Sequence, residues 1–331
     1  MTWHGRKVLV TGAAGFIGSN LVAALARAGA EVRAFIRYNS RNDRGLLEDM
    51  PEDVSAQVDV IWGDLTDRER VMEAVRGTDV VFHLGALIAI PYSYQAAESY
   101  VKVNVEGTLN VLEACRRYGT SRLLQTSTSE VYGTAQYTPI DELHPLHPQS
   151  PYAATKVASD QLALSYYRSF DMPVVVVRPF NNFGPGQSLR AVIPTILAQA
   201  QAGDVLRLGS TDSVRDFLFV EDTARGFMAI ADAQAETVVG ETFNLATGVG
   251  HTITSVIEHA EHMAGRKLIV QTDEQRIRPV NSEVWTLIGC AKRAKEVFGW
   301  EPQTTLQQGL EATWEWLLTR KDRLRAKQYT L

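Results

Sequence analysis

Three glycines between an apolar segment and a helix-like segment most constrain the fold of this chain. The segment KVLVTG (Lys7–Gly12) is typical of a buried parallel strand, and SNLVAALARAG (Ser19–Gly29) is typical of a helix that ends at a glycine. Glycines at such a junction often form only a turn. Here the strand before and the helix after are the context in which free helix amides bind a pyrophosphate. We predict a dinucleotide site with Gly12 in the tight turn, Gly15 at the pyrophosphate and Gly18 at the helix–strand contact.

Strand-like and helix-like segments alternate from the N-terminus to about residue 178. The strand-like segments are short and apolar, and the intervening segments have helical spacing of apolar residues. Such alternation predicts βαβ units, and therefore an α/β fold with a doubly wound parallel (Rossmann) sheet. The expected strands are EVRAFIR (31–37), VDVIWGDL (58–65), DVVFHLGA (79–86), RLLQTSTSE (122–130) and PVVVVRP (173–179), and the expected helices are 67–77, 103–119 and 152–170.

The pattern changes after residue 178, where proline and glycine become frequent. The segments DFLFVEDTARGFMAIADA (216–233) and ETFNLATG (241–248) indicate a return to the sheet, and residues from His251 onward indicate helices with one strand. We therefore expect residues 1–178 plus about 215–248 to form the dinucleotide-binding Rossmann domain. Residues from about 179–214 plus 249–331 are expected to form a smaller, mostly helical substrate-binding lobe.

Composition excludes several classes of protein. The chain has 331 residues and a net charge of −5, without the basic surface that nucleic-acid binding requires. No apolar run is long enough for a membrane span, and the N-terminus has no signal-peptide pattern. Two cysteines, Cys115 and Cys290, do not make a disulfide framework and suit a reducing compartment. We expect a cytoplasmic protein.

A tyrosine and a lysine stand four residues apart in SPYAATK. At this spacing Tyr152 and Lys156 share one face of the expected helix. A tyrosine, whose ordinary pKa is near 10, is a weak base at neutral pH, but a neighbouring ammonium and a nicotinamide cation favour its phenolate. The phenolate can then take a proton from an alcohol while hydride leaves the same carbon. A lone pair at this spacing arises by chance, so its weight comes from the other motifs.

Taken together, these motifs resemble the extended short-chain dehydrogenase/reductase superfamily over nearly the whole chain. The spacing of the three glycines, GxxGxxG, belongs to this resemblance. The other matching residues are Asp64, His83–Ala86, Asn104, Thr128, Tyr152, Lys156, RPFNNFGPG (178–186) and RDFLFVED (215–222).

The resemblance implies a tightly bound NAD or NADP that is regenerated in each cycle. The acidic residue typical of NAD sites would stand at Ile36, and the basic Arg37 and Arg41 that follow favour NADP slightly. Arg37 could instead stack on adenine or face solvent, Asp64 could cap a strand end, and Asn104 could be a buried helix residue. The implied cofactor-binding residues are Gly12, Gly15, Phe16, Ile17, Gly18, Arg37, Asp64, Leu65, Leu84, Ala86, Asn104, Tyr152 and Lys156.

The resemblance also implies a substrate, because relatives of this size mostly act on nucleotide-diphosphate sugars. Arg215 and Arg278 match the diphosphate-binding arginines, whose guanidinium groups suit phosphate oxygens, although either could be a surface charge. Asn181, Arg190 and Val192 match the substrate loop. No metal site is expected, since His144 and His147 stand in a proline-rich loop and suit a loop or substrate-contact role.

The segment QTSTSEVYG separates reaction types within this family. Epimerases at C4 usually have a hydroxyl residue here followed by small or apolar residues, whereas 4,6-dehydratases have Thr-Asp-Glu or Thr-Ser-Glu. Thr128-Ser129-Glu130 therefore resembles GDP-mannose 4,6-dehydratase, and more closely the dehydratases of legionaminic-acid pathways that act on nucleotide-linked N-acetylglucosamine. Glu130 would remove the C5 proton after C4 oxidation. Ser129 stands where many relatives have an acid, and its pKa is too high for a strong acid, so Glu130 would return the proton that releases water from C6.

Three other functions stay open. If Glu130 only caps a turn or pairs with a lysine, the chain would be a 4-epimerase. A 5,6-dehydratase would use the same Tyr152 and Glu130, and a non-catalytic dinucleotide sensor would usually lack the Tyr–Lys pair. The helices expected at 103–118 and 152–170 resemble those of the superfamily's four-helix dimer interface, so we expect a homodimer.

Overall fold

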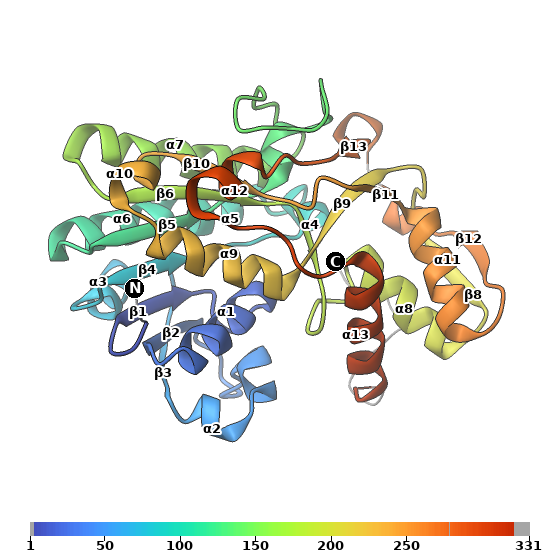
Figure 1. Cartoon of the computed structure of the whole chain (residues 1–331), viewed down its shortest axis with the longest axis horizontal. Coiled ribbons are helices and arrows are strands. Elements are labelled where there is room, and N and C mark those ends of the chain that lie inside the picture. The colour runs from blue at the N-terminus through green and yellow to red at the C-terminus, as the bar shows by residue number, and fades with distance from the viewer. Residues whose placement is uncertain (1–2, 278, 321–331) are drawn as a thin grey trace.

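The computed structural model describes residues 3–277 and 279–320, and its centre is a parallel sheet of seven strands in the order β10-β6-β5-β4-β1-β2-β3 (Figure 1). Every strand pair in this sheet is parallel. The predicted doubly wound Rossmann sheet is thus confirmed. Its strands are β1 (Lys7–Thr11), β2 (Glu31–Arg37), β3 (Val58–Gly63), β4 (Val80–His83), β5 (Arg122–Thr126), β6 (Val174–Pro179) and β10 (Thr242–Leu245).

Helices cover both faces of this sheet because the strand side chains alternate between two apolar cores. Val8 and Val10 belong to the core beneath α1 (Phe16–Arg27) and α9 (Val220–Asp232). Leu9, between them in sequence, belongs to the opposite core, with α3 (Arg68–Val75), α6 (Gly107–Tyr118) and α7 (Pro151–Phe170). Figure 1 shows α6 and α7 on one side of the sheet and α1 and α9 on the other.

A smaller lobe lies beyond one end of the sheet, at the right of Figure 1. Its helices α8 (Val192–Ala202), α11 (Ile253–Ala264) and α13 (Leu306–Leu318) share a third core. Its strands are β7 (Asn181–Phe183), β8 (Val205–Leu208), β9 (Val214–Phe219), β11 (Gly250–Thr252), β12 (Ile269–Thr272) and β13 (Thr286–Leu287).

The segments expected to return to the main sheet divide between the two parts. ETFNLATG does return, as β10 beside β6. DFLFVED does not: β9 pairs with β7, β11 and β13. It contributes Leu218 to the core of the main sheet, and the following helix α9 packs on that sheet. The short helix α12 (Lys292–Phe298) also contributes Ala294 to the core of the main sheet. Trp300 lies in the same core, and its Nε1 donates to the carbonyl of Asp222.

Two predicted elements have different boundaries in the structure. The strand expected over residues 122–130 stops at Thr126, and a 3₁₀ turn (Ser129–Tyr132) follows, capped by the Thr128 side chain. The helix expected from residue 103 begins as a π-helical turn (Val101–Glu106) before α6. The remaining short elements are α2 (Glu52–Ser55), α4 (Ile90–Ser93), α5 (Ala97–Tyr100), α10 (Ala235–Val238) and 3₁₀ turns at Gly45–Asp49, Glu274–Arg276 and Val280–Ser282.

Within residues 3–277 and 279–320, no helix combines the length and apolar character that crossing a bilayer would need.

Candidate active site

The glycine turn has the shape of a backbone cradle. Gly12 has a φ of +69°, and a Cβ there would lie 2.8 Å from the backbone of Gly85, so only glycine fits this turn. A Cβ on Gly18 would overlap the carbonyl oxygen of Gly12. Gly15 is the N-cap of α1 and makes no side-chain cap, which leaves the first amides of the helix for an anion. These features fit the pyrophosphate of a dinucleotide.

The other residues predicted to bind the cofactor surround this turn. Phe16 and Ile17 form the first turn of α1, and Phe16 lies close to Gly186 of the loop after β7. Leu65 packs beside Gly85, and Leu84 and Ala86 follow β4 at the same edge of the sheet. The carboxyl ends of the parallel strands therefore gather these residues where a doubly wound fold binds its ligand.

Arg37 and Asp64 lie at the ends of neighbouring strands and interact electrostatically. Partial burial opposes ionisation of Asp64, but two hydrogen bonds from Thr66 and the positive charge of Arg37 outweigh it and lower the pKa of Asp64. The Asp64 carboxylate accepts from both the amide and the hydroxyl of Thr66, at 2.9 and 2.7 Å. Asp64 thus makes the strand-end cap that was its alternative role. Arg37 is exposed at the end of β2, and its contact with the cofactor stays a prediction.

A directed chain of hydrogen bonds supports the loop after β4. The hydroxyl of Thr108 donates to the carbonyl of Asn104 at 2.6 Å, so His83 Nε2 must donate to Thr108. His83 Nδ1 then accepts from the hydroxyl of Thr11, which itself accepts from the amide of Gly85. Burial and the charge of Lys156 lower the pKa of His83 to about 3, so the ring stays neutral and this orientation is stable.

Asn104 is buried and has a definite structural role. Its side chain accepts from the amide of Leu87 at 2.8 Å and donates to the carbonyl of Leu87 and to Thr155 on α7, both at 3.0 Å. It therefore joins the loop after β4 to the helix of the Tyr–Lys pair. This agrees with the alternative that Asn104 is a buried polar residue, and direct contact with the cofactor stays a prediction.

The predicted catalytic side chains meet where β5 ends and α7 begins. Tyr152 is buried, and its side chain is hydrogen-bonded to that of Thr128. Burial raises the pKa of Tyr152, the bond to Thr128 lowers it, and the negative charge of Glu130 raises it again. Thr128, Glu130 and Tyr152 therefore form one interacting group, and Ser129 is buried beside them.

Lys156 lies one turn further along α7 and is also buried. Burial lowers the pKa of Lys156 to about 8, and the negative charge of Asp160 opposes that fall. Tyr100 packs edge-on against Tyr152, with ring centroids 6.3 Å apart, and its hydroxyl donates to the carbonyl of Ala89. Tyr100 and Asp160 were not among the residues predicted from the sequence. The four-residue spacing of Asp160 from Lys156 was the available signal.

The residues predicted to bind substrate lie along the smaller lobe. Asn181 begins β7, and among the described residues its buried Oδ1 has no hydrogen-bond partner. Arg190 is exposed and acts electrostatically on Tyr100, which places it near the catalytic group. Val192 is half-buried at the start of α8. Arg278 lies outside the described residues.

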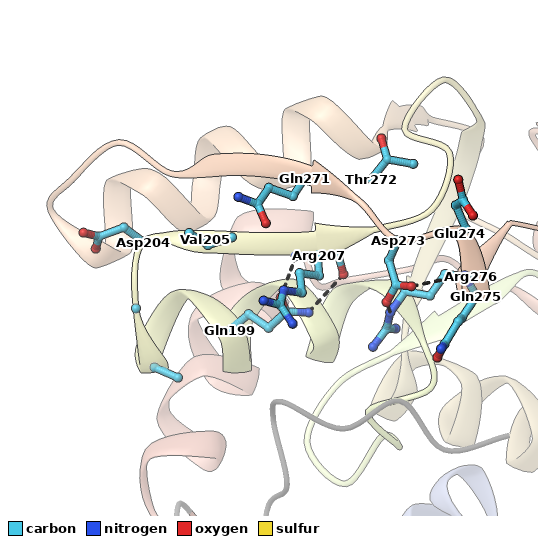
Figure 2. Close-up of a pocket in the computed structure, with 12 residues that line it drawn as sticks. Gln199, Asp204, Val205, Arg207, Gln271, Thr272, Asp273, Glu274, Gln275 and Arg276 are labelled. Atoms are coloured by element: carbon cyan, nitrogen blue, oxygen red, sulfur yellow. Dashed lines mark hydrogen bonds and ion pairs between the residues drawn. The ribbon is translucent and has the colours of Figure 1, made fainter.

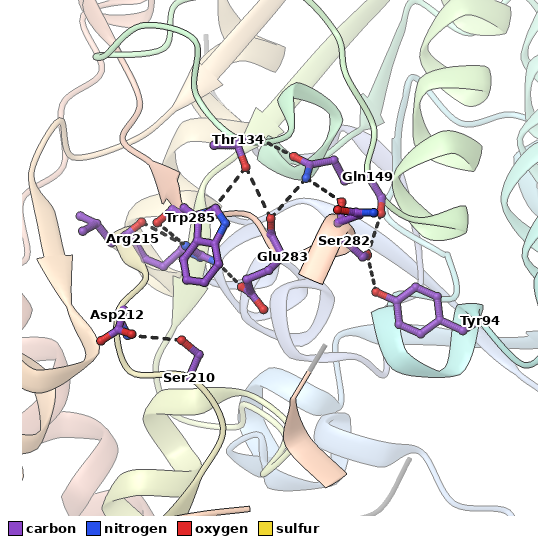
Figure 3. Close-up of polar contacts among 11 residues, drawn as sticks. Tyr94, Thr134, Gln149, Ser210, Asp212, Arg215, Ser282, Glu283 and Trp285 are labelled. Carbon is purple, nitrogen blue, oxygen red and sulfur yellow. Dashed lines mark hydrogen bonds and ion pairs between the residues drawn. The ribbon is translucent and has the colours of Figure 1, made fainter. Parts of the chain in front are cut away.

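Arg215 is buried in a network that joins both lobes (Figure 3). Its guanidinium pairs with the carboxylate of Glu283 at 3.3 Å and donates to the carbonyl of Trp285 at 3.3 Å. Ser282 donates to the carbonyl of Gln149, next to the start of α7. The segment 282–285 therefore links Arg215 to the residues just before α7, the helix of the Tyr–Lys pair. Binding of a diphosphate by Arg215 stays a prediction.

A separate cavity of about 630 Å³ lies in the smaller lobe between α8, β8 and β12 (Figure 2). Its lining includes Gln199, Arg207, Gln271 and Arg276, and none of the predicted catalytic residues. Gln199 is engaged with the backbone of Arg207 at 2.7 and 3.2 Å. The cavity is therefore distinct from the group around Tyr152.

His144 has the predicted loop role. Its Nδ1 donates to the carbonyl of Pro145 at 2.9 Å, and its Nε2 accepts from the amide of Gln136 at 2.9 Å. The ring is buried against Tyr132 and Tyr137. With both nitrogens engaged, His144 holds the loop before α7 in place.

Comparison with known proteins shows the family of this chain. A model of the GDP-mannose 4,6-dehydratase family matches residues 9–313, nearly the whole chain. The chain belongs to this family. A dTDP-glucose 4,6-dehydratase from Neisseria meningitidis is 34% identical over 346 residues, which cover 96% of this chain and 94% of the relative.

Solved structures show the same fold in family members. An epimerase from Methanothermobacter thermautotrophicus has a TM-score of 0.88 at 30% identity, covering 98% of this chain and 96% of its own. A dTDP-glucose 4,6-dehydratase from Streptomyces venezuelae, solved with NAD bound, has a TM-score of 0.82 at 26% identity, covering 96% and 98%. Dehydratases and epimerases thus share this architecture, and the local residues must separate them.

Proposed function

We propose that this chain is a nucleotide-sugar 4,6-dehydratase. The observation that carries the proposal is the position of Glu130, a buried carboxylate on the same turn as Thr128 and close enough to act on Tyr152. Epimerisation at C4 needs only the hydroxyl and the tyrosine. A carboxylate at this position suits an additional proton removal, as a dehydratase requires.

The first chemical task is to remove the proton of the C4 hydroxyl. Thr128 would hydrogen-bond O4, and Tyr152 would take the proton as phenolate. Burial raises the pKa of Tyr152, so positive charge from Lys156 is needed to make the phenolate accessible near neutral pH. When bound, the nicotinamide supplies the hydride acceptor for C4 and the hydride donor for C6.

The second task is the loss of water. Oxidation of C4 acidifies the proton on C5, and Glu130 would remove it. The side chain of Ser129 is a poor acid, so we propose that Glu130 returns this proton to the departing C6 hydroxyl. The product would be a nucleotide 4-keto-6-deoxy sugar, with the cofactor regenerated.

The cofactor is a nicotinamide dinucleotide, and the NAD complex of the Streptomyces relative supports NAD. The backbone turn Gly12–Gly18 would hold its pyrophosphate, and Lys156 its nicotinamide ribose. The basic residues Arg37 and Arg41 favour NADP slightly, and Arg37 lies exposed at the end of β2. The mass of the cofactor released from the purified protein distinguishes the two.

Two finer proposals concern substrate and assembly. Nucleotide-linked N-acetylglucosamine is proposed as substrate from the resemblance of the Thr-Ser-Glu segment and its neighbours, whereas the Neisseria relative is named for dTDP-glucose. A homodimer is proposed because apolar side chains are exposed along α6 and α7 and the turn before α6, namely Val101, Leu109, Tyr167 and Phe170. Light scattering of the purified protein tests the dimer: a monomeric mass would contradict it.

The proposed reaction is tested by incubating the purified protein with a panel of nucleotide-linked glucose, mannose and N-acetylglucosamine. We expect one member to lose the mass of one water without added cofactor, because the hydride is returned within each cycle. Product NMR separates the 4-keto-6-deoxy sugar from a 5,6-ene. An unchanged mass with inversion at C4 would identify a 4-epimerase instead.

A further inference from the structure

A buried carboxylate, Asp160, continues the Tyr–Lys pair along α7. Tyr152, Lys156 and Asp160 are successive residues at four-residue spacing, and all three are buried in the middle part of one helix. Side chains at this spacing lie on one face of a helix, one turn apart. Asp160 has no exposed surface, so its charge is not screened by water.

Asp160 is held by groups from two strands. Its Oδ2 accepts from the hydroxyl of Ser127, at the end of β5, at 2.7 Å. The same oxygen accepts from Nε and Nη2 of Arg178 on β6, at 3.3 and 3.2 Å. Among the described residues, its second oxygen, Oδ1, is buried and has no hydrogen-bond partner. The carboxylate is thus held in position by hydrogen bonds to one of its two oxygens, Oδ2.

The network extends away from the catalytic group beyond Arg178. Nη1 of Arg178 donates to the hydroxyl of Tyr132 at 3.0 Å, and that hydroxyl donates to Asn244 on β10 at 2.8 Å. These contacts tie Asp160 to three strands of the sheet. They also offer a way to disturb the network without removing the carboxylate.

Other charged or titratable groups surround the Tyr–Lys pair, and each has a definite effect. Asp160 opposes the fall in the pKa of Lys156 that burial causes, and it raises the pKa of Tyr152. Glu130 from the turn after β5 and Tyr100 from α5 also raise the pKa of Tyr152. His83 from β4 faces Lys156 but stays neutral. Burial raises the pKa of Asp160, and the positive charges of Arg178 and Lys156 and the hydrogen bond from Ser127 oppose this rise. The ion pair with Arg178 favours the carboxylate form of Asp160, one helical turn from the lysine.

We infer that Asp160 is a positioning residue that keeps Lys156 in its charged form, so that the ammonium can stabilise the phenolate of Tyr152. Asp160 acts through the lysine and touches neither substrate nor cofactor. The importance of Lys156 for turnover rests on the proposed function. The electrostatic coupling of Asp160 to Lys156 does not, because it can be measured in the protein without substrate.

The sign of the effect follows from the charges. Removing the negative charge of Asp160 makes protonated Lys156 less stable, so the pKa of Lys156 falls. It also makes the Tyr152 phenolate more stable, so the pKa of Tyr152 falls too. An activity profile that depends on ammonium and phenolate should therefore move as a whole to lower pH. A purely structural defect would lower activity at every pH without moving the profile.

The test is a pH titration of the lysine side chains by carbon NMR of protein labelled at lysine Cε. The Lys156 signal is identified by its loss in Lys156→Arg. In the wild-type chain its midpoint is expected near the pKa of about 8 that burial sets. In Asp160→Asn we expect the midpoint to fall by about one pH unit or more, the effect typical of losing a nearby opposite charge.

The matched control is Tyr132→Phe, which removes a hydrogen bond from Arg178 and leaves the Asp160 carboxylate in place. Its Lys156 midpoint should equal that of the wild type.

Asp160→Asn leaves Arg178 buried without its carboxylate, and such a loss can prevent folding. Circular dichroism detects this, and Asp160→Asn with Arg178→Gln then takes its place. Its expected fall in the Lys156 midpoint is smaller, because loss of the Arg178 positive charge offsets part of the loss of the carboxylate.

Two results would overturn the inference. One is a Lys156 midpoint in the folded Asp160 variant that stays at the wild-type value or rises. The other is an equal fall in Tyr132→Phe, which would mean that the integrity of the network matters and not the charge. Neither result depends on which sugar, if any, the protein dehydrates, so a failure here is distinguishable from a failure of the proposed function.

Discussion

Replacing Tyr152 with phenylalanine is expected to lower kcat by about 10²–10⁴-fold, the usual contribution of a positioned proton acceptor. The variant removes one oxygen atom and keeps the ring that packs against Tyr100. The variant also loses the side-chain hydrogen bond between Tyr152 and Thr128. The free energy of unfolding should therefore change by only about 1 kcal/mol. Steady-state kinetics on the substrate found by the panel gives kcat.

Tyr100→Phe is the matched control for this variant. Tyr100 is an equally buried tyrosine in contact with Tyr152, and its hydroxyl donates to a backbone carbonyl and not to Thr128. We expect Tyr100→Phe to keep most of its turnover. If Tyr152→Phe retained wild-type turnover, or if both variants lost it equally, Tyr152 would not be the proton acceptor.

Glu130→Gln is expected to separate oxidation at C4 from the loss of water. Glutamine has nearly the same shape but cannot take the C5 proton, so elimination should slow by about 10²–10⁴-fold. Thr128, Tyr152 and Lys156 stay in place, so C4 should still be oxidised. Borodeuteride trapping of the enzyme-bound sugar would then place deuterium at C4 in a product that keeps its C6 hydroxyl. Mass spectrometry of this product measures both steps together.

Ser129→Ala is the neighbouring comparison for Glu130→Gln. Ser129 is buried beside Glu130, and its hydroxyl is a weak acid, so its removal should slow the loss of water less than the loss of the carboxylate does. Water loss at the wild-type rate in Glu130→Gln would remove the main reason to prefer a dehydratase over an epimerase.

The sheet and the glycine turn after β1 could be predicted because short-range patterns determine them. Buried parallel strands are continuous apolar runs, and a Cβ at Gly12 or Gly18 in the turn between β1 and α1 would overlap backbone atoms. The four-residue spacing of Tyr152 and Lys156 places them on one face of a helix, and the other motifs of the family resemblance give the pair its catalytic interpretation. The strands, the turn and the helical spacing each need only neighbouring residues.

The errors and omissions concern contacts between distant residues. β9 has the apolar composition of a main-sheet strand, yet it pairs with β7, β11 and β13, because which sheet a strand joins depends on tertiary contacts. The role of Asp160 on α7 depends on Arg178 of β6 and on Ser127, which follows β5. The burial of Arg215 depends on Glu283, 68 residues away. No local pattern contains this information.

The most direct test of the dehydratase proposal uses a substrate that carries deuterium at C4. The proposed cycle removes hydride from C4 and returns it to C6 of the same sugar. We therefore predict that proton and deuterium NMR of the product will find the label in the new C6 methyl group. A product inverted at C4 that keeps the label at C4 and the hydroxyl at C6 would contradict the account and show a 4-epimerase.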